Sequence, residues 1–243
     1  MSDFALRRHA AAHVVLDADS TGLAGVRIAG DGVVAVDDAV EHHLRRVLRL
    51  GDGDLVTVTD GAGRWVPTRV SGTGSDLLVV DGEVRNEVRT RPVFTVAAAL
   101  PKGDRLEWMV QKVTECGADR LVLLDCDRSV VRWKPERAER QLERLRRIAD
   151  EAARQSRRVW RLELVPPTPA AEVLPDAAVA EPGGEPLLDA LGDSHSIVAI
   201  GPEGGWSDDE SAAISHRIDL GPNILRTETA AIVATALCVV RNH

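Results

Sequence analysis

Short apolar segments rich in β-branched residues alternate with glycine-containing turns along the first third of the chain. The apolar segments cover residues 33–36, 55–59 and 77–80, and turns over residues 51–54, 61–63 and 72–74 separate them. Asp37 and Asp38 precede apolar positions at helical spacing, which predicts one helix over residues 39–48. Short strands at such spacing favour a small β-barrel or sandwich in this part of the chain.

Strands and helices alternate in the rest of the chain. Residues 83–92 are polar and lack apolar periodicity, so we place a boundary there and expect two domains, residues 1–85 and 86–243. The expected strands cover residues 93–100, 121–124, 162–165, 197–200 and 218–220, and the expected helices cover residues 103–117, 135–156, 170–174, 208–214 and 227–240. This alternation predicts an α/β domain with a mostly parallel sheet and helices on both faces.

Composition narrows the class of protein. A chain of 243 residues that is 44% hydrophobic can form a substantial core. No apolar run approaches the ~20 residues that cross a bilayer, so no membrane association is expected. The N-terminal sequence has no charged-then-apolar signal layout. Cys116, Cys126 and Cys238 lack metal-ligand spacing and are expected to be free thiols in a reducing cytoplasm, with no metal site.

The net charge of −8 is unevenly distributed. Residues 132–161 hold eleven Arg or Lys against five Asp or Glu, whereas residues 172–219 hold eleven acids against one Arg. The overall charge argues against a protein that is basic over its whole surface. The basic segment is either a local phosphate-binding face or the solvated face of an amphipathic helix, and the charge pattern does not choose between them.

A glycine-rich loop follows the apolar strand over residues 197–200. It reads Ile200-Gly201-Pro202-Glu203-Gly204-Gly205-Trp206-Ser207, and Ser207 begins a Ser-x-x-Glu capping box that ends at Glu210. Ligands of open α/β sheets lie at the carboxyl ends of strands, and glycines let backbone groups approach a ligand closely. The loop matches neither Gly-x-Gly-x-x-Gly nor a P-loop. It suits a neutral or zwitterionic ligand with an adenine ring better than a triphosphate.

A second loop has a similar construction. It reads Leu220-Gly221-Pro222-Asn223-Ile224-Leu225-Arg226-Thr227-Glu228-Thr229-Ala230. A short strand turns through Gly-Pro and enters an apolar helix, with Arg226 and Glu228 where the loop meets the helix. A charged pair at this point is either a capping ion pair or part of a site, and the pair alone favours neither.

Together the two loops resemble the RsmE family of ribosomal RNA uridine methyltransferases. Further similar segments are Lys102 with residues 107–117, Arg128-Ser129, Gln155-Ser156-x-Arg158, and, in the family's PUA-like RNA-binding barrel, His43-Leu44-x-x-Val47-Leu48-Arg49. The resemblance therefore covers nearly the whole chain. The chain departs from the family where it has Arg154-Gln155-Ser156-Arg157-Arg158 instead of Glu-Gln-Ser-Gly-Arg, and Cys116-Gly117 instead of Leu-Gly.

The resemblance implies a fold and an activity. The C-terminal domain is expected to be a knotted SPOUT methyltransferase domain, although chains in general do not thread their own loops. The N-terminal domain is expected to be a small PUA-like β-barrel. The implied reaction is methylation at N3 of a uridine in 16S ribosomal RNA or the small ribosomal subunit, U1498 in the family, with S-adenosylmethionine as the cofactor. A cytoplasmic homodimer is also implied, with the final apolar helix either at the interface or in the core.

The resemblance also assigns residues. The cofactor is expected to be held by the two loops and by a third segment near Glu181, at Ile200, Gly201, Pro202, Glu203, Gly204, Gly205, Leu220, Asn223, Leu225 and Glu181. RNA contacts are expected at His43, Arg49, Arg128, Arg132, Arg154 and Arg158.

Three of these residues are expected to take part in the chemistry. Uridine N3 lies on the Watson–Crick edge, so the target base must be unpaired or flipped. Arg226 is expected to stabilise the developing uracil anion. Glu228 is expected to orient Arg226. Glu203 is the rival candidate for accepting the N3 proton, and the sequence does not decide between these two acids.

Three other interpretations stay open. The chain could be a related methyltransferase acting on another RNA nucleotide, or a non-catalytic RNA-binding protein of ribosome assembly. The presence of Glu203, Arg226 and Glu228 argues against the non-catalytic interpretation. A nucleotide-binding metabolic enzyme is the third, and it leaves the basic helix and the PUA-like segment unexplained.

Overall fold

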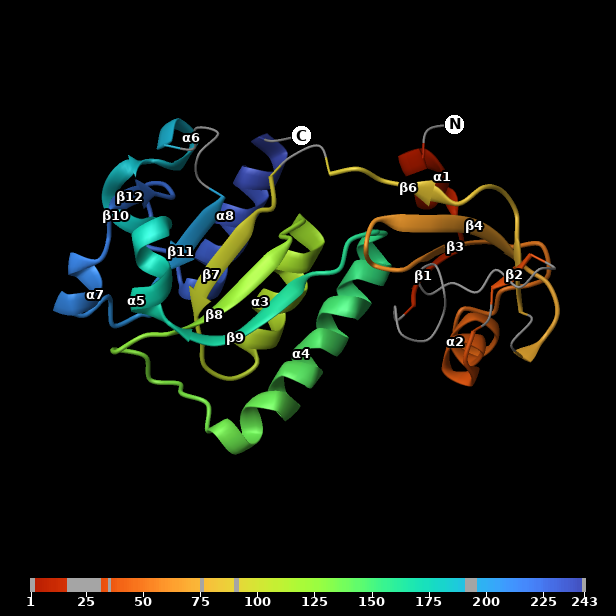
Figure 1. Ribbon diagram of the computed structural model, residues 1–243, viewed down its shortest axis with the longest axis horizontal. Helices are drawn as coiled ribbons and strands as arrows, with labels where there is room; N and C mark the ends of the chain where they lie inside the picture. The colour runs from red at the N-terminus through yellow and green to blue at the C-terminus, as the bar shows by residue number, and fades with distance from the viewer. Residues whose placement is uncertain are drawn as a thin grey trace. The chain divides into compact units, whose positions relative to one another are not determined.

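The computed structural model describes residues 3–16, 32–34, 36–74, 77–89, 92–190 and 196–241 (Figure 1). It divides into two compact units. The first comprises Met1–Arg89 and Ala153–Arg161, and the second comprises Thr90–Ala152 and Leu162–His243. The predicted boundary was a single cut after residue 85, so the sequence pattern did not indicate that residues 153–161 return to the first unit.

The first unit is built on one sheet. Its elements, as far as the structure describes them, are α1 (Asp3–His9), β1 (Ala12–Val15), β2 (Val33–Val34), α2 (Asp38–His42), a π-helix (His43–Val47), β3 (Leu55–Thr59), β4 (Arg64–Val70), β5 (Leu78–Val80) and β6 (Arg85–Asn86). The strand order is β1-β3-β4-β5-β2, and β6 pairs with β4. β1 runs parallel to β3, and the other pairs are antiparallel. A core of Val and Leu side chains, including Val56, Val58 and Val66, lies against this sheet.

The predicted helix after residue 37 is present, and Asp37 caps it as expected by accepting a hydrogen bond from the Val40 amide at 2.8 Å. Its second half is a π-helix, a form that occurs often at functional sites. The strand predicted over residues 55–59 is confirmed. The strand predicted over residues 33–36 is observed at Val33–Val34, and residue 35 lies outside the described residues. β1 and β4 were not predicted; Pro67 within β4 is a residue that sequence patterns place outside central strands.

The second unit contains a fully parallel sheet in the part of the chain that is described. Its strands are β7 (Thr95–Ala99), β8 (Arg120–Asp125), β9 (Glu163–Pro169), β10 (Ala178–Pro186), β11 (Ile197–Ile200) and β12 (His216–Asp219), in the order β12-β10-β11-β7-β8-β9. The predicted parallel α/β architecture is therefore confirmed. The trefoil knot stays a prediction of the resemblance.

Helices cover both faces of this sheet (Figure 1). They are α3 (Arg105–Cys116), α4 (Pro135–Ser156), α5 (Ala170–Val173), α6 (Leu187–Ala190), α7 (Asp208–Ala212) and α8 (Thr227–Arg241), with a 3₁₀ turn at Leu174–Asp176. Successive residues of β7 belong to different cores: Val96 and Ala98 pack with residues of α3, α4 and α8, and Ala97 and Ala99 pack with residues of α5. A strand that is buried on both faces has no polar alternation, and this explains the continuous apolar run seen in the sequence.

α4 begins and ends where the sequence pattern predicted. β10 was not predicted because Pro182, Gly183, Gly184 and Pro186 within it are typical of a loop. No helix in the described ranges is both long and apolar enough to cross a membrane.

Candidate active site

Three irregular segments of the second unit meet at one edge of its sheet. Two are loops that leave the carboxyl ends of β11 and β12. The third is an irregularity within β10, whose register against β12 shifts between Ala180 and Glu185. Because neighbouring parallel strands end at the same edge, these segments come together at the place where α/β sheets usually bind ligands.

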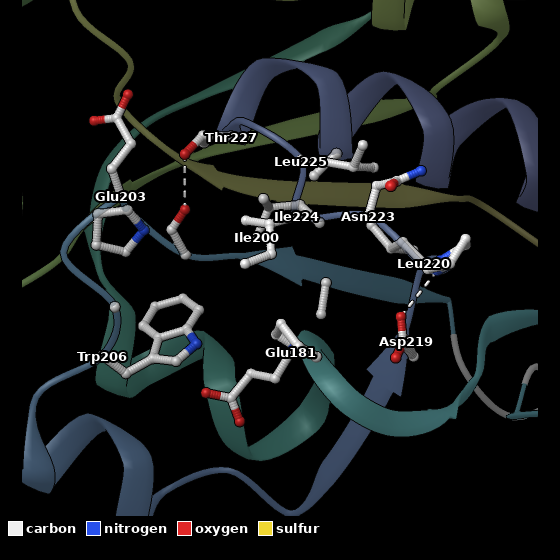
Figure 2. A pocket seen from close by; sticks show the side chains of 18 residues that line it. Glu181, Ile200, Glu203, Trp206, Asp219, Leu220, Asn223, Ile224, Leu225 and Thr227 are labelled. Atoms are coloured by element: carbon white, nitrogen blue, oxygen red, sulfur yellow. Dashed lines mark hydrogen bonds between the residues drawn. The ribbon is translucent and has the colours of Figure 1, made fainter.

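The three segments enclose a hollow of about 360 Å³ (Figure 2). Nine of the ten predicted cofactor residues line it, namely Glu181, Ile200, Gly201, Pro202, Glu203, Gly205, Leu220, Asn223 and Leu225. The tenth, Gly204, lines a neighbouring hollow instead. Residues that sequence reasoning did not select also line the first hollow, among them Trp206, Asp219 and Thr227.

Asp219 holds two of the three segments together. Its Oδ2 accepts a hydrogen bond from the Gly183 amide in β10 at 2.9 Å. Its Oδ1 accepts one from the Gly221 amide in the loop after β12, also at 2.9 Å (Figure 2). These backbone N–H groups, with that of Leu220, stabilise the ionised form and lower the pKa of the Asp219 carboxyl below its usual value. The rim of the hollow therefore carries a fixed negative charge. In the sequence, Asp219 could have been recognised as an acidic residue at the end of a strand that leads into a loop.

The loop after β11 is fixed to α8 and to a buried ring. Thr227 Oγ1 donates a hydrogen bond to the Gly201 carbonyl at 2.9 Å. Trp206 is 5% exposed, and a Cβ atom added to Gly201 would lie 2.9 Å from its ring. Gly201 is therefore required because the indole packs directly against the backbone at that point.

The predicted capping box begins α7 and secures the other end of the same loop. Ser207 Oγ accepts from the Glu210 amide, while Glu210 Oε2 accepts from the Ser207 amide. The buried Glu210 also uses Oε1 to accept from the Asp127 amide at 2.9 Å, and Ser207 Oγ donates to Asp127 Oδ2 at 2.7 Å. These bonds tie the loop after β11 to the chain that follows β8.

Two predicted catalytic acids meet at one arginine. Arg105 Nη1, in the first turn of α3, lies 3.0 Å from Glu203 Oε1 and 3.5 Å from Glu228 Oε1. The Glu203 carboxylate points away from Trp206 and Glu181 (Figure 2). Glu228 is 4% exposed, and its Oε2 is a buried oxygen without a hydrogen-bond partner within the described residues.

Arg226 forms no ion pair with this cluster in the part of the chain that the structure describes. Its side chain is exposed, and Glu228 pairs with Arg105 rather than with it. The expected Glu228–Arg226 orientation is therefore not the one that the chain adopts. The sequence patterns did not indicate Arg105 as a site residue. The feature that could have indicated it is a second cation, three residues after Lys102, at the start of the helix that follows β7.

The predicted RNA-binding residues fall into two sets. His43, Arg49, Arg154 and Arg158 belong to the first unit, whereas Arg128 and Arg132 follow β8 in the second. Arg49 has a left-handed backbone with φ of 57° and is exposed, two residues after the end of the π-helix at Val47. Arg128 Nη2 lies 3.5 Å from Asp208 Oδ1, and Arg132 donates to the Asp127 carbonyl at 3.2 Å.

Comparison with known proteins assigns both parts of the chain. An RNA methyltransferase domain family matches residues 89–239, and an RNA methyltransferase PUA domain family matches residues 36–81. Ribosomal RNA small subunit methyltransferase E of Mycobacterium bovis is 36% identical over 226 residues, which cover 84% of this chain and 85% of the relative. The protein of the same name from Bacillus subtilis is 31% identical over 217 residues, covering 79% and 84%.

Solved structures agree with this assignment. A ribosomal RNA small subunit methyltransferase E from Neisseria gonorrhoeae, bound to S-adenosyl methionine, is similar with a TM-score of 0.71 at 27% identity, covering 86% of this chain and 91% of that one. A probable rRNA-methyltransferase from Porphyromonas gingivalis gives a TM-score of 0.73 at 25% identity, covering 94% and 96%.

The fold and the site thus define a class, an α/β RNA methyltransferase domain joined to a PUA-like domain. More narrowly, the chain belongs to the ribosomal RNA small subunit methyltransferase E family, RsmE, as the two loops indicated.

Proposed function

We propose that this protein transfers a methyl group from S-adenosylmethionine to N3 of a uridine in 16S ribosomal RNA, the position that is U1498 in the family. The observation that carries the proposal is the hollow at the carboxyl edge of the parallel sheet, formed by the two loops whose sequences are those of the family. The N. gonorrhoeae relative binds S-adenosyl methionine, and the relatives' shared name supports the small-subunit RNA as substrate.

The residues of the hollow fit this cofactor. Trp206, Ile200 and Leu225 give it apolar walls that suit an adenine ring. Backbone groups of the two loops suit the polar atoms of the adenosine and methionine parts. The ionised Asp219 and the carboxylate of Glu181 supply negative charge suited to hydroxyl and ammonium donors. When bound, the cofactor supplies a methyl group on a positively charged sulfur.

The chain must manage one proton and one negative charge. Uridine N3 carries a proton that has to leave, and the uracil bears negative charge until the methyl group is transferred to N3. Arg226, exposed at the loop that leads into α8, is our candidate for stabilising that charge. Glu203 and Glu228 are the candidate acceptors for the proton, and Arg105 holds both carboxylates at the same place.

Substitution separates the two acceptors. Glu203→Gln and Glu228→Gln each remove one base while keeping a side chain of similar size. The acceptor's variant should lose kcat by about 100-fold or more, whereas the other should lose much less. S-adenosylmethionine affinity, measured on both variants, shows whether a loss comes from the chemical step.

We also propose that the enzyme acts as a cytoplasmic homodimer. α8 is largely a core helix, with Ala231, Ala234 and Cys238 buried. Trp108 on α3 and Val240 at the end of α8 are exposed apolar side chains, 45% and 74% exposed, on two helices that pack together. Sedimentation of the wild type against Trp108→Glu tests this, because a dimer whose interface includes the exposed Trp108 side chain should dissociate in the variant.

Two measurements test the function itself. Calorimetric titration with S-adenosylmethionine should give binding that Asp219→Ala weakens. Incubation with unmethylated small subunits should then place a methyl group on one uridine, mapped by mass spectrometry of nuclease fragments. A methyl group on another nucleotide would favour a related methyltransferase with a different RNA target. A protein that binds RNA but does not bind S-adenosylmethionine would favour a non-catalytic protein of ribosome assembly.

A further inference from the structure

A second hollow, of about 240 Å³, borders the same loop as the cofactor hollow. Pro202, Glu203 and Thr227 line both hollows. Gly204 faces the second one, where a Cβ atom added to it would lie 3.3 Å from the Arg128 carbonyl oxygen and 3.4 Å from the Arg128 Cβ. The Gly-Pro-Glu-Gly-Gly loop therefore contributes to two adjoining sites.

The walls of the second hollow combine apolar and cationic groups. Val130, Val131 and Pro202 supply apolar surface, and Val130 is 74% exposed although it is large and hydrophobic. Lys102 and Arg128 supply positive charge. A nucleotide binds to the same two features, because its flat base packs on an apolar surface and its phosphate pairs with a cation.

The charges around the hollow leave these cations available. Its one acid, Glu203, is already paired with Arg105 at 3.0 Å. The Lys102 ammonium has no carboxylate partner in the described ranges, and Arg128 is paired at 3.5 Å only with the fully exposed Asp208. Such an exposed pair is weak, so a phosphate can replace the Asp208 carboxylate at little cost.

We propose that the second hollow is a subsite for one nucleotide of the substrate RNA, with its phosphate on Lys102 and Arg128 and its base against Val130, Val131 and Pro202. The assignment rests on the proposed function. Since Pro202 and Glu203 form part of both walls, the loop separates this base from the cofactor hollow. The nucleotide is therefore one that flanks the methylated uridine, and the subsite sets which neighbour the enzyme accepts.

The test compares cations on the two edges of the sheet. Lys102→Ala and Arg128→Ala remove charge from the subsite. Arg120→Ala is the matched control, because Arg120 begins β8 at the opposite edge and has an exposed ion pair with Glu163, as Arg128 has with Asp208. Three quantities are measured for each variant: the Kd for S-adenosylmethionine, the Kd for a labelled 16S ribosomal RNA fragment that contains the target uridine, and KM and kcat on unmethylated small subunits.

The expected result is specific to the RNA. Lys102→Ala and Arg128→Ala should each raise the RNA Kd and KM by roughly five- to tenfold and lower the slope of log Kd against log salt by about one. The Kd for S-adenosylmethionine and kcat should stay at the wild-type values. Arg120→Ala should change none of these quantities.

Two results would overturn the subsite. One is RNA affinity and salt dependence equal to those of Arg120→Ala; the other is a loss of kcat with unchanged RNA affinity, which would make these cations part of the chemical step. A wild type that binds no S-adenosylmethionine would instead contradict the proposed function. The RNA-binding comparison would still decide the subsite in that case, because it does not require methyl transfer.

Discussion

The guanidinium group of Arg105 lies 3.5 Å from the carboxylate of Glu228, which is buried in the first turn of α8. This ion pair connects the first helix of the second unit to the last one. It also brings Glu228 next to Glu203, which lies on the loop after β11. The position of both candidate bases therefore depends on a residue that belongs to neither cofactor loop.

Removing Arg105 should cost stability through Glu228. Arg105→Ala leaves a buried carboxylate without its cation, which we expect to lower the free energy of unfolding by about 1–3 kcal/mol. Glu228→Gln in the same chain should recover part of that loss, since the uncompensated charge is then gone. Urea unfolding of the two single variants and the double variant measures this coupling. Additive losses would contradict it.

Asp219 should control cofactor affinity because it orders both Gly183 and Gly221. Asp219→Ala removes both acceptors and should raise the Kd for S-adenosylmethionine by about tenfold, whereas Asp219→Asn keeps one carbonyl acceptor and should have a smaller effect. The backbone hydrogen bonds from Gly183 and Gly221 lower the pKa of this carboxyl below its usual acidic value, so the group is ionised near neutral pH. Wild-type affinity should therefore show no Asp219 titration between pH 5 and 8. Calorimetry across that range checks both expectations.

Two glycines of one loop should respond differently to alanine. At Gly201 a methyl group meets the buried Trp206 ring at 2.9 Å, so Gly201→Ala must move the loop or the ring and should weaken cofactor binding. At Gly205 the added Cβ meets open space, but φ is +70°. Gly205→Ala should then cost stability by roughly 1 kcal/mol from backbone strain. Thermal unfolding and cofactor titration of both variants separate the effects; equal cofactor losses would show that steric contact is not the cause.

His13 should make the first unit sensitive to acid. Its ring is buried between Thr57 Oγ1 and the Arg158 carbonyl, each at 2.8 Å, and burial lowers its pKa to about 4. The unfolded chain takes up this proton near pH 6.5 while the folded chain does not, so stability falls as the pH drops from about 6.5 to 4. The shift corresponds to about 3 kcal/mol.

His13→Gln removes this titration. The variant is expected to lose less stability than the wild type between pH 7 and pH 4.5 when both are unfolded in urea. Comparing the two curves cancels the other titrating groups that they share. Parallel pH dependence in the two proteins would mean that His13 does not contribute.

The sequence was most informative where local pattern and tertiary burial coincide. α4 could be predicted to its ends because an apolar stripe runs through an otherwise charged helix. The loop after β11 was recognised because glycines follow a buried strand directly. β10 could not be found, because its pairing with β12 is interrupted between Ala180 and Glu185 and the residues there are typical of a loop; Gly184 approaches the backbone of Ile218 too closely for any side chain.

The residues of the candidate site show the same contrast between local sequence pattern and long-range contact. Residues that line the hollow from the two loops, such as Gly201 and Leu220, could be located from loop sequence alone. Arg105 could not, because its role arises from contact with Glu203 and Glu228, which are 98 and 123 positions away in the chain. Long-range ion pairs of this kind leave no periodic signal in one sequence.

The return of Ala153–Arg161 to the first unit has a consequence for how this protein could be divided or recombined. Neither unit corresponds to one uninterrupted stretch of gene. A fragment that stops at residue 89 lacks the backbone carbonyl to which His13 binds, and a fragment that starts at residue 90 carries a piece of its neighbour's fold in mid-chain. Exchange of RNA-binding units between relatives would thus require two coordinated crossovers, so the two parts are expected to be inherited together.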